Sequence, residues 1–325
     1  MTVLVIGGGG YVGSHMVKCL LENGETPVIL DNFSKGFPDA ILGGVIERGD
    51  YGDAATLRDV FTRHNIDSVM LFASFIEVGE SVAHPAKYYS NNVAKCFVML
   101  EVMVERGVRN LVFSSSAAVY GSHEEAIRED AACRPLSPYG RTKWMVELVL
   151  QDFSAAYGIA FYALRYFNAS GASPCGRIGE RHNPETHLIP LVLQAASGRR
   201  ADIKVFGRNY PTPDGTCLRD YVHVDDLCDA HWLALKRLRA GDMGGFYNLG
   251  NAKGYSVAQV IDVAREVTVR AITVEDVAPR AGDPAILVAD SNSIRNALGW
   301  APRYDELGVI VEHAWRWELS KGTLW

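Results

Sequence analysis

A glycine-rich turn between a short apolar run and a helical pattern constrains this chain more than any other feature. Residues Thr2 to Ile6 are mostly apolar and β-branched, which is typical of a buried strand. The turn GGGGYVG follows at 7–13, and apolar residues then recur at helical spacing until Asn23-Gly24. Glycines in such a turn allow a tight bend, a close approach to a pyrophosphate and close helix–strand packing. This order predicts a dinucleotide-binding unit, although such a turn can also simply connect two elements.

An acidic residue at the end of the next expected strand indicates which dinucleotide is bound. The strand Pro27 to Leu30 is followed by Asp31, close to the roughly 20-residue spacing at which a ribose-binding acid follows the glycines. A carboxylate there binds the ribose 2′-hydroxyl of NAD and repels the 2′-phosphate of NADP. We therefore expect NAD as the cofactor.

Strands and helices alternate along the first half of the chain. We expect further strands at 45–50, 68–73, 110–114 and 160–165, and helices at 54–64, 85–106 and 137–157. This alternation is typical of a parallel sheet covered on both faces, in which ligands bind beyond the carboxyl ends of the strands. The expected fold class is α/β, a doubly wound parallel sheet of the Rossmann type with a smaller α/β substrate lobe.

The regular pattern loosens beyond about residue 167, where 173–185 and 208–216 are rich in glycine, proline and polar residues. We expect residues 1–167 to form the Rossmann domain, with segments at about 220–250 returning to it. Residues 168–325 are expected to form mainly the substrate lobe. Tyr247 to Gly250 and a helix near Val257 to Val267 are expected to rejoin the main sheet.

A tyrosine and a lysine lie four residues apart in the expected helix at 137–157. Positions i and i+4 share one helix face, so Tyr139 and Lys143 are expected side by side. An ammonium beside a phenol favours the phenolate, and we expect Lys143 to lower the tyrosine pKa from its usual value of about 10. The pair predicts a general base, although Tyr-x-x-x-Lys is also common in ordinary amphipathic helices.

Composition excludes several other classes of protein. The chain has 325 residues, 48% of them hydrophobic, and a net charge of −6 without a basic block, which argues against nucleic acid as a partner. No apolar run approaches about 20 residues, so no membrane span is expected, and the early first strand leaves no room for a signal peptide. Six scattered cysteines without a C-x-x-C motif predict reduced thiols in a cytoplasmic protein and no metal site.

Motifs spread along nearly the whole chain carry a resemblance to a known family. They read GGGGYVGSH at 7–15, DNFS at 31–34, VGESV at 78–82, YYSNN at 88–92, SSSAAVYG at 114–121 and RYFN at 165–168. HLIP at 187–190, DGTCLRDYVHV at 214–224 and RAGDP at 280–284 follow. The chain resembles the extended short-chain dehydrogenase/reductases and, among them, the UDP-glucose 4-epimerases. The later motifs belong to nucleotide-sugar enzymes and not to the superfamily at large.

The resemblance implies an isomerase that inverts C4 of a UDP-hexose through a transient 4-keto sugar, using tightly bound NAD. Tyr139 is the implied catalytic base, and Lys143 holds the nicotinamide ribose and depresses the tyrosine pKa. Ser116 is implied to hydrogen-bond the reacting oxygen, although a hydroxyl at a strand end can also simply cap backbone groups.

The implied ligand-binding residues fall into two groups. Those for the cofactor are Gly7, Gly10, Tyr11, Val12, Gly13, Asp31, Asn32, Phe33, Ser34, Lys35, Gly36, Asp50, Tyr51, Phe72, Ala73, Ser74, Asn91, Ser114, Tyr139, Lys143, Tyr166 and Phe167. Those for the substrate are Ser116, Tyr139, Asn168, His187, Leu188, Val205, Phe206, Arg219, Tyr221, Arg280 and Asp283. Arg219 and Arg280 are the expected partners of the diphosphate, because arginine binds phosphates in a bidentate manner.

Several positions depart from the family pattern. Ile6 replaces a threonine, Ile76 replaces a lysine near the cofactor with Glu77 beside it, and Ala118 replaces a threonine near the sugar. Leu287 matches a position whose bulk controls access of N-acetylated sugars, and leucine is intermediate in size. A leucine at this position therefore neither favours nor excludes N-acetylated UDP-sugars.

The same fold also supports other functions, and the sequence bears on each of them. A nucleotide-sugar dehydratase needs an acid pair where this chain has Ser116-Ala117-Ala118-Val119, and a non-catalytic nucleotide-binding module does not need Ser116, Tyr139 and Lys143. An epimerase acting on a UDP-linked N-acetylhexosamine, pentose or uronate is a further alternative. The resemblance also suggests a homodimer, formed through the helices at 85–106 and 137–157.

Overall fold

The chain folds around one large parallel sheet. The computed structural model describes residues 2–123, 125–279 and 284–321. In these residues seven strands pair in parallel throughout. Their order is β10 (Gly244–Leu249), β6 (Ala160–Tyr166), β5 (Asn110–Ser116), β4 (Ile66–Leu71), β1 (Thr2–Ile6), β2 (Val28–Asp31) and β3 (Val45–Arg48). The strand order reverses between β1 and β4, the position at which doubly wound sheets bind ligands. The predicted fold class is confirmed.

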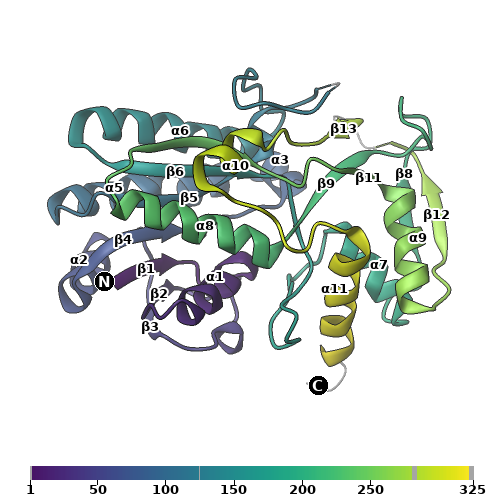
Figure 1. Cartoon of the computed structure of the whole chain (residues 1–325), viewed down its shortest axis with the longest axis horizontal. Coiled ribbons are helices and arrows are strands. Elements are labelled where there is room, and N and C mark those ends of the chain that lie inside the picture. The colour runs from purple at the N-terminus through teal and green to yellow at the C-terminus, as the bar shows by residue number, and fades with distance from the viewer. Residues whose placement is uncertain (1, 124, 280–283, 322–325) are drawn as a thin grey trace.

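Helices cover both faces of this sheet because its buried strands are apolar on both sides. Along β1, Leu4 and Ile6 face one core while Val3 and Val5 face the other, as the two-residue period of a strand requires. The first core is closed by α2 (Ala54–His64), α5 (Lys95–Glu105) and α6 (Pro138–Tyr157). The second is closed by α1 (Tyr11–Glu22), α8 (Val224–Arg239) and α10 (Asn292–Leu298), and Figure 1 shows α8 and α1 lying across the near face.

The long helix expected at 85–106 is interrupted by a wider turn. It follows α3 (Val78–Ala83) and runs through α4 (Pro85–Tyr89), a π-helical turn (Ser90–Ala94) and α5. Such turns insert one residue into a helix and are frequent at functional sites. Asn91 and Asn92 lie within it.

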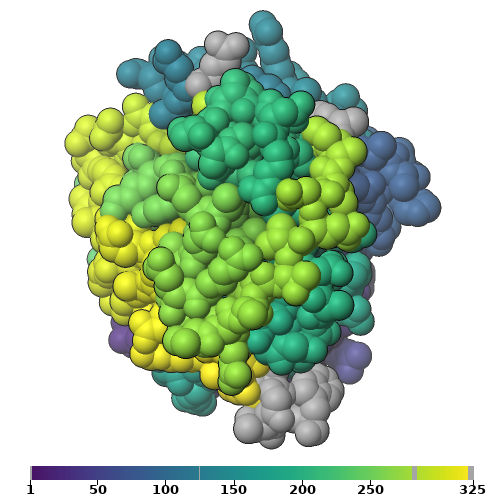
Figure 2. All heavy atoms as spheres, turned by 90° about the vertical axis from the view of Figure 1, so that its right-hand side faces the viewer, coloured from purple at the N-terminus to yellow at the C-terminus, as the bar shows by residue number. Residues whose placement is uncertain are grey.

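A second lobe is built from the later part of the chain. A four-stranded sheet contains β7 (Asn168–Ser170), β9 (Leu218–His223), β11 (Gly254–Ser256) and β13 (Ile286–Leu287), and β8 (Ile203–Phe206) pairs with β12 (Val274–Val277). Three helices, α7 (Leu188–Ala196), α9 (Val257–Thr268) and α11 (Leu307–Lys321), share one apolar core with residues of β8, β9, β11 and β12. Figure 2 views this lobe end-on, with α9 and the yellow α11 side by side.

Of the two later segments that were expected to rejoin the main sheet, only one does so. Residues 244–249 do so as β10, beside β6. The helix near Val257 to Val267 does not, and that prediction is wrong. This helix, α9, buries Val260, Ile261 and Ala264 against α7 and α11 in the second lobe. Its amphipathic pattern specified an apolar face but not the core that receives it.

The structure also bears on membrane-spanning helices and on the state of the cysteines. No helix in the described ranges is long and apolar enough to cross a membrane. All six cysteines are free thiols, and four of them are buried.

Candidate active site

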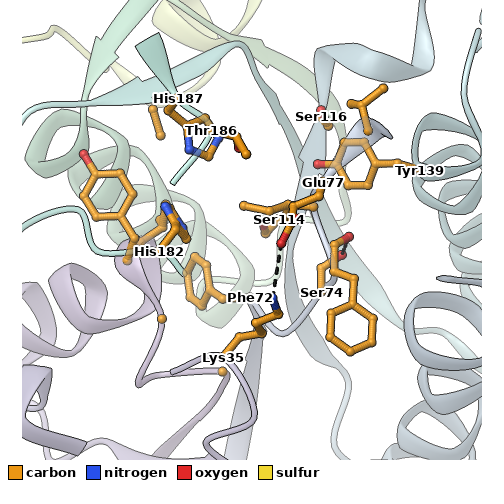
Figure 3. A pocket seen from close by; sticks show the side chains of 18 of the residues that line it. Lys35, Phe72, Ser74, Glu77, Ser114, Ser116, Tyr139, His182, Thr186 and His187 are labelled. Atoms are coloured by element: carbon orange, nitrogen blue, oxygen red, sulfur yellow. Dashed lines mark hydrogen bonds and ion pairs between the residues drawn. The ribbon is translucent and has the colours of Figure 1, made fainter. Parts of the chain in front are cut away.

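One large cavity lies at the carboxyl end of the parallel sheet, between the sheet and the second lobe. It has a volume of about 1010 Å³, at the upper end of the range for ligand pockets. Predicted residues that line it are Gly7, Gly10, Tyr11, Val12, Gly13, Asp31, Asn32, Ser34, Lys35, Gly36, Tyr51, Phe72, Ala73, Ser74, Asn91, Ser114, Ser116, Tyr139, Lys143, Tyr166, Phe167, Asn168, His187 and Arg219. The predicted cofactor turn, catalytic group and part of the substrate set thus share one space (Figure 3).

The glycine turn is shaped by two close backbone contacts. A Cβ atom on Gly13 would lie 2.2 Å from the carbonyl oxygen of Gly7, and one on Gly7 would lie 2.5 Å from the backbone nitrogen of Ala73. Gly7 also has a positive φ of 84°, which favours glycine. The turn therefore brings β1 and the N-terminus of α1 close together, which leaves the start of α1 facing the cavity.

Asp31 is fixed at the end of β2 by backbone amides. Its Oδ2 accepts a hydrogen bond from Gly9 N at 2.8 Å, and its Oδ1 accepts one from Phe33 N at 2.7 Å. These bonds hold a buried carboxylate beside the glycine turn, where it lines the cavity. This is the position expected of an acid that binds a ribose hydroxyl.

The predicted catalytic residues come from the end of β5 and the first turns of α6. Ser137 caps α6 by accepting a hydrogen bond from Gly140 N at 3.1 Å, and Pro138 occupies the first helical position. This start places the Tyr139 hydroxyl within hydrogen-bonding reach of Ser116. Figure 3 shows both side chains on the same wall of the cavity.

Lys143 lies one turn further along α6 and is buried. Its Nζ donates a hydrogen bond to the carbonyl oxygen of Ser114 at 2.8 Å and lies 5.9 Å from the centre of the Tyr139 ring. The tyrosine and the lysine therefore lie close together, as their spacing predicts, and Ser116 joins them, as the family resemblance implies.

The predicted effect of Lys143 on the tyrosine is wrong for the chain alone. Burial raises the pKa of Tyr139, and the hydrogen bond with Ser116 offsets only part of that rise. Burial also lowers the pKa of Lys143 to about 7, so this lysine carries only a partial charge near neutral pH. Desolvation is the largest cause of both pKa shifts, and the spacing of the two residues does not reveal it.

Another wall of the cavity is organised by the π-helical turn. The Asn92 side chain accepts a hydrogen bond from Phe75 N at 2.9 Å and donates one to Phe75 O at 3.0 Å. The same side chain donates to Thr142 Oγ1 at 3.2 Å, and Tyr51 donates to Asn91 O at 2.6 Å. The wider turn thereby ties the loop after β4 to α6.

A second cavity of about 300 Å³ adjoins the first on the side of the second lobe. Asn168, His187 and Arg219 line both cavities, and Leu188, Phe206 and Tyr221 line the smaller one. Arg200, which no sequence motif marked, is a further cation that lines both cavities. Two arginines therefore face the space in which a diphosphate was predicted.

Three predicted site residues in the described part of the chain line neither cavity. Val205 is buried in the core of the second lobe, and Asp50 pairs with Lys95 at 2.6 Å and accepts a hydrogen bond from Asn32. The Phe33 ring lies against Gly9 of the glycine turn, and the Arg48 guanidinium is 5.9 Å from the ring centre. Arg280 and Asp283 lie outside the described residues.

The position next to Ile76 introduces a charge pair into the cavity wall. Glu77 Oε1 lies 3.2 Å from Lys35 Nζ, and the same nitrogen donates to Asn183 O at 3.3 Å (Figure 3). Lys35 therefore balances the carboxylate that stands near the site of the missing family lysine. Sequence reasoning noted Glu77 but did not predict its partner.

The stretch 180–187 contributes more to the cavity than its composition suggested. Glu180, His182, Glu185 and Thr186 line the cavity together with His187. Figure 3 shows His182, Thr186 and His187 across the cavity from Tyr139. The sequence does contain a pattern that could have indicated this clustering, Glu-x-His-x-x-Glu-x-His at 180–187. It was not recognised because most of it lies in a stretch that was expected to be a polar connection.

Comparison with known proteins supports this geometry. The model of the NAD dependent epimerase/dehydratase family matches residues 3–250. The chain belongs to this family. The UDP-glucose 4-epimerase of Halalkalibacterium halodurans is 48% identical over 318 residues, which cover 98% of this chain and 95% of that protein.

Solved structures of family members are similar over almost their whole length. The UDP-glucose 4-epimerase from Brucella ovis in complex with NAD has a TM-score of 0.94 and 43% identity, and the match covers 97% of each chain. The enzyme from Bifidobacterium longum in complex with NAD⁺ and UDP has a TM-score of 0.94 and 34% identity, with complete coverage of both chains. The resemblance derived from the motifs is confirmed.

Proposed function

We propose that this protein is a UDP-hexose 4-epimerase that interconverts UDP-glucose and UDP-galactose through a transient 4-keto sugar. One observation carries the proposal. A single cavity holds the glycine turn and Asp31 at one end, Ser116, Tyr139 and Lys143 in the middle, and residues of the second lobe at the other. A dinucleotide and a nucleotide sugar can thus meet at one reactive group.

The described residues fit NAD as the cofactor. The backbone approach of Gly13 to Gly7 leaves room for a pyrophosphate at the start of α1, where free amide groups bind anions. Asp31, held by two backbone amides, would bind the adenosine ribose and repel a 2′-phosphate. Lys143 would hold the nicotinamide ribose. NAD, when bound, accepts a hydride from C4 of the sugar and returns it to the opposite face of the ketone.

The chain itself moves the proton that accompanies this hydride. Tyr139 as the phenolate removes the proton of the sugar 4-hydroxyl while the C4–H bond breaks, and a C4 carbonyl forms. Ser116 donates a hydrogen bond to the reacting oxygen, and Tyr139 returns the proton when C4 is reduced again. Because burial raises the pKa of Tyr139, its hydroxyl is protonated in the cofactor-free chain. Formation of the phenolate therefore depends on the positive charge brought by oxidised NAD together with Lys143.

The second lobe supplies the contacts that fix the nucleotide. Arg200 and Arg219 line the two adjoining cavities and would bind the diphosphate, with Asn168, Leu188 and Phe206 around the remainder of UDP. Leu287 lines the large cavity, so its size bears on which sugars enter. We propose UDP-glucose and UDP-galactose as the preferred pair.

The assembly and location proposed for the protein rest on its surface and thiols. Phe97 of α5 and Met145 and Leu148 of α6 are 41–43% exposed, which is unusual for large apolar side chains on two neighbouring helices. We propose that these helices form a homodimer interface. Free, mostly buried cysteines support a cytoplasmic location.

A panel of UDP-sugars with product analysis tests the proposed reaction. UDP-galactose should yield UDP-glucose, and the equilibrium mixture should be reached from either side. A stable 4-keto-6-deoxy product would instead show a dehydratase. Faster conversion of an N-acetylated, pentose or uronate substrate would reassign the sugar, and no turnover of any sugar would support a non-catalytic binding module.

A further inference from the structure

Four potential metal ligands gather in the loop that precedes α7. Among the described residues, Glu180, His182, Glu185 and His187 place one ligand atom each within 4.8 Å of all the others. They come from one stretch of the chain and lie on the cavity wall opposite Tyr139, where Figure 3 shows the rings of His182 and His187. None of them has a role in the proton transfer described above.

The spacing of these atoms suits a small tetrahedral ion. Nδ1 of His182 lies 3.4 Å from Glu180 Oε1 and 3.5 Å from Glu185 Oε2, and Nδ1 of His187 lies 2.9 Å and 3.2 Å from Glu180 Oε1 and Glu185 Oε1. Zinc bound by nitrogen and carboxylate oxygen at about 2.0–2.2 Å has ligand atoms roughly 3.3–3.5 Å apart. The two contacts of His182 are longer than a good hydrogen bond but match this separation.

Hydrogen bonds orient the Glu185 carboxylate and fix the backbone of Glu180. Glu185 Oε1 accepts hydrogen bonds from the backbone amides of Thr186 at 2.8 Å and His187 at 2.9 Å. The backbone of Glu180 is fixed because its carbonyl accepts a hydrogen bond from Trp317 Nε1 at 2.9 Å. Both carboxyl side chains are at most 7% exposed. Hydrogen bonds behind the ligands are typical of protein metal sites.

The charge of the cluster favours a cation. Glu180 and Glu185 are almost fully buried and lie within 4.8 Å of both imidazoles, so two negative charges share one small and poorly solvated space. A divalent cation bound among them would balance this charge, while the two imidazoles in their neutral form supply nitrogen ligands.

We propose that Glu180, His182, Glu185 and His187 bind one divalent transition-metal ion, with zinc the best match to their spacing and chemistry. With four protein ligands the site is structural, because no coordination position is left for a reacting water. Imidazole and carboxylate together suit zinc better than magnesium or calcium, which prefer oxygen alone. This inference runs against the expectation of no metal site, which rested on cysteine spacing alone.

The position of the loop indicates what the ion would stabilise. Arg181 forms a bidentate pair with Asp39 and stacks over Phe37, 3.6 Å from the ring centre, and Asn183 O accepts from Lys35. The loop therefore bridges the segment after β2, which borders the cofactor end of the cavity, and the start of α7 in the second lobe. A bound ion would hold this bridge in place.

The metal content of the purified protein tests the proposal without reference to catalysis. Untagged protein, purified without chelators, should contain about one zinc per chain by elemental analysis. His182→Asn and Glu185→Gln, which remove one ligand each, should contain less than about a tenth of that. His84→Ala is the matched control, because this exposed histidine lies at the start of α4 without a side-chain capping bond.

Titration of chelator-treated protein decides between a metal site and a network of ion pairs. Added zinc should raise the melting temperature of wild type and His84→Ala, and added cobalt should give the visible spectrum of a tetrahedral ion. Removal of one ligand should weaken zinc binding by at least about a hundredfold, the upper end of what loss of an outer-sphere partner costs. No zinc in the purified protein together with no response to either ion, or equal binding by His182→Asn, would overturn the proposal. Because neither readout involves a sugar, failure of this site and failure of the proposed epimerase activity are distinguishable.

Discussion

At the scale of single residues, Tyr139 is a base that burial keeps protonated until its partners assemble. The lysine four positions away is itself desolvated, and it hydrogen-bonds the backbone of Ser114 rather than the phenol. Sequence spacing predicted that Tyr139 and Lys143 meet, because helix geometry fixes their relative positions, and the family resemblance added Ser116 at the end of β5. It did not predict the direction of the tyrosine pKa, because desolvation depends on residues distant in sequence.

Replacement of this tyrosine separates chemistry from binding. Tyr139→Phe should fold and keep NAD, because Lys143, Asp31 and the glycine turn are unchanged. Its turnover should fall by at least about a hundredfold, the usual scale for a general acid–base group. Steady-state kinetics and the NAD content of the purified variant measure both effects, and turnover at the wild-type rate would refute the assignment of the base.

At the scale of elements, the site depends on where β1, α1, β5 and α6 begin and end. The order of these elements was predicted because apolar periodicity and glycines mark it. The π-helical turn between α4 and α5, and the core that receives α9, could not be predicted. Both depend on packing partners that the local pattern does not specify.

Because α1 approaches β1 closely at Gly13, a single methyl group added there should disturb the glycine turn. In Gly13→Ala the Cβ would lie 2.2 Å from Gly7 O, so the turn must open, at a cost of about 1–3 kcal/mol for such overpacking. The variant should lose most of its NAD and melt at a lower temperature. Gly308→Ala is the control, because its Cβ would meet no atom within 4 Å and α11 should tolerate alanine. Equal NAD content in the two variants would contradict this account of the turn.

A buried ion pair joins the strands and helix that carry the catalytic group. Glu147 of α6 binds Arg165 of β6 at 2.6 and 2.9 Å and accepts a hydrogen bond from Ser115 of β5. Glu147→Ala leaves a buried arginine without its partner and should destabilise the protein by about 3–5 kcal/mol. Glu105→Ala, which breaks the exposed pair with Arg58, should cost under about 1 kcal/mol. Denaturant unfolding measures the difference, and equal losses would show that Glu147 does not stabilise this junction.

At the scale of the whole molecule, the two lobes are joined through buried polar contacts as well as apolar cores. His223, at the junction of β9 and α8, accepts a hydrogen bond from Asp225 N at 3.1 Å, and its Nε2 lies 3.0 Å from Nδ1 of His313 in α11. The Tyr304 ring lies 4.6 Å away, centre to centre. Burial and the neighbouring histidine lower the pKa of His223 to about 3.

This neutral histidine predicts a stability that decreases in acid. In the unfolded chain a histidine takes up its proton near pH 6.5, but in the folded chain His223 does so only near pH 3. Its contribution is therefore complete above pH 6.5 and is lost as the pH falls towards 3. In His223→Asn the unfolding free energy should fall less steeply from pH 6.5 to 4.5, by up to about 1.4 kcal/mol per pH unit. Urea unfolding of wild type, His223→Asn and the control His84→Ala at several pH values in this range measures the effect. Equal slopes of unfolding free energy against pH for wild type and His223→Asn would contradict the assignment.

The proposed dimer makes a separate prediction. Leu148→Lys places a charge among the exposed apolar side chains of α5 and α6, so the protein should become monomeric in light scattering. Leu319→Lys, on the exposed face of α11, should leave the dimer intact. A monomeric wild type, or a dimeric Leu148→Lys, would exclude this interface.

The most direct test of the whole account follows the hydrogen atom at C4. UDP-galactose labelled with deuterium at C4 should be converted to UDP-glucose that keeps the deuterium at C4, because the hydride leaves and returns within one closed cavity. Mass spectrometry and proton NMR of the product locate the label. Loss of deuterium to the solvent, or conversion without breakage of the C4–H bond, would contradict a reversible oxidation at this site.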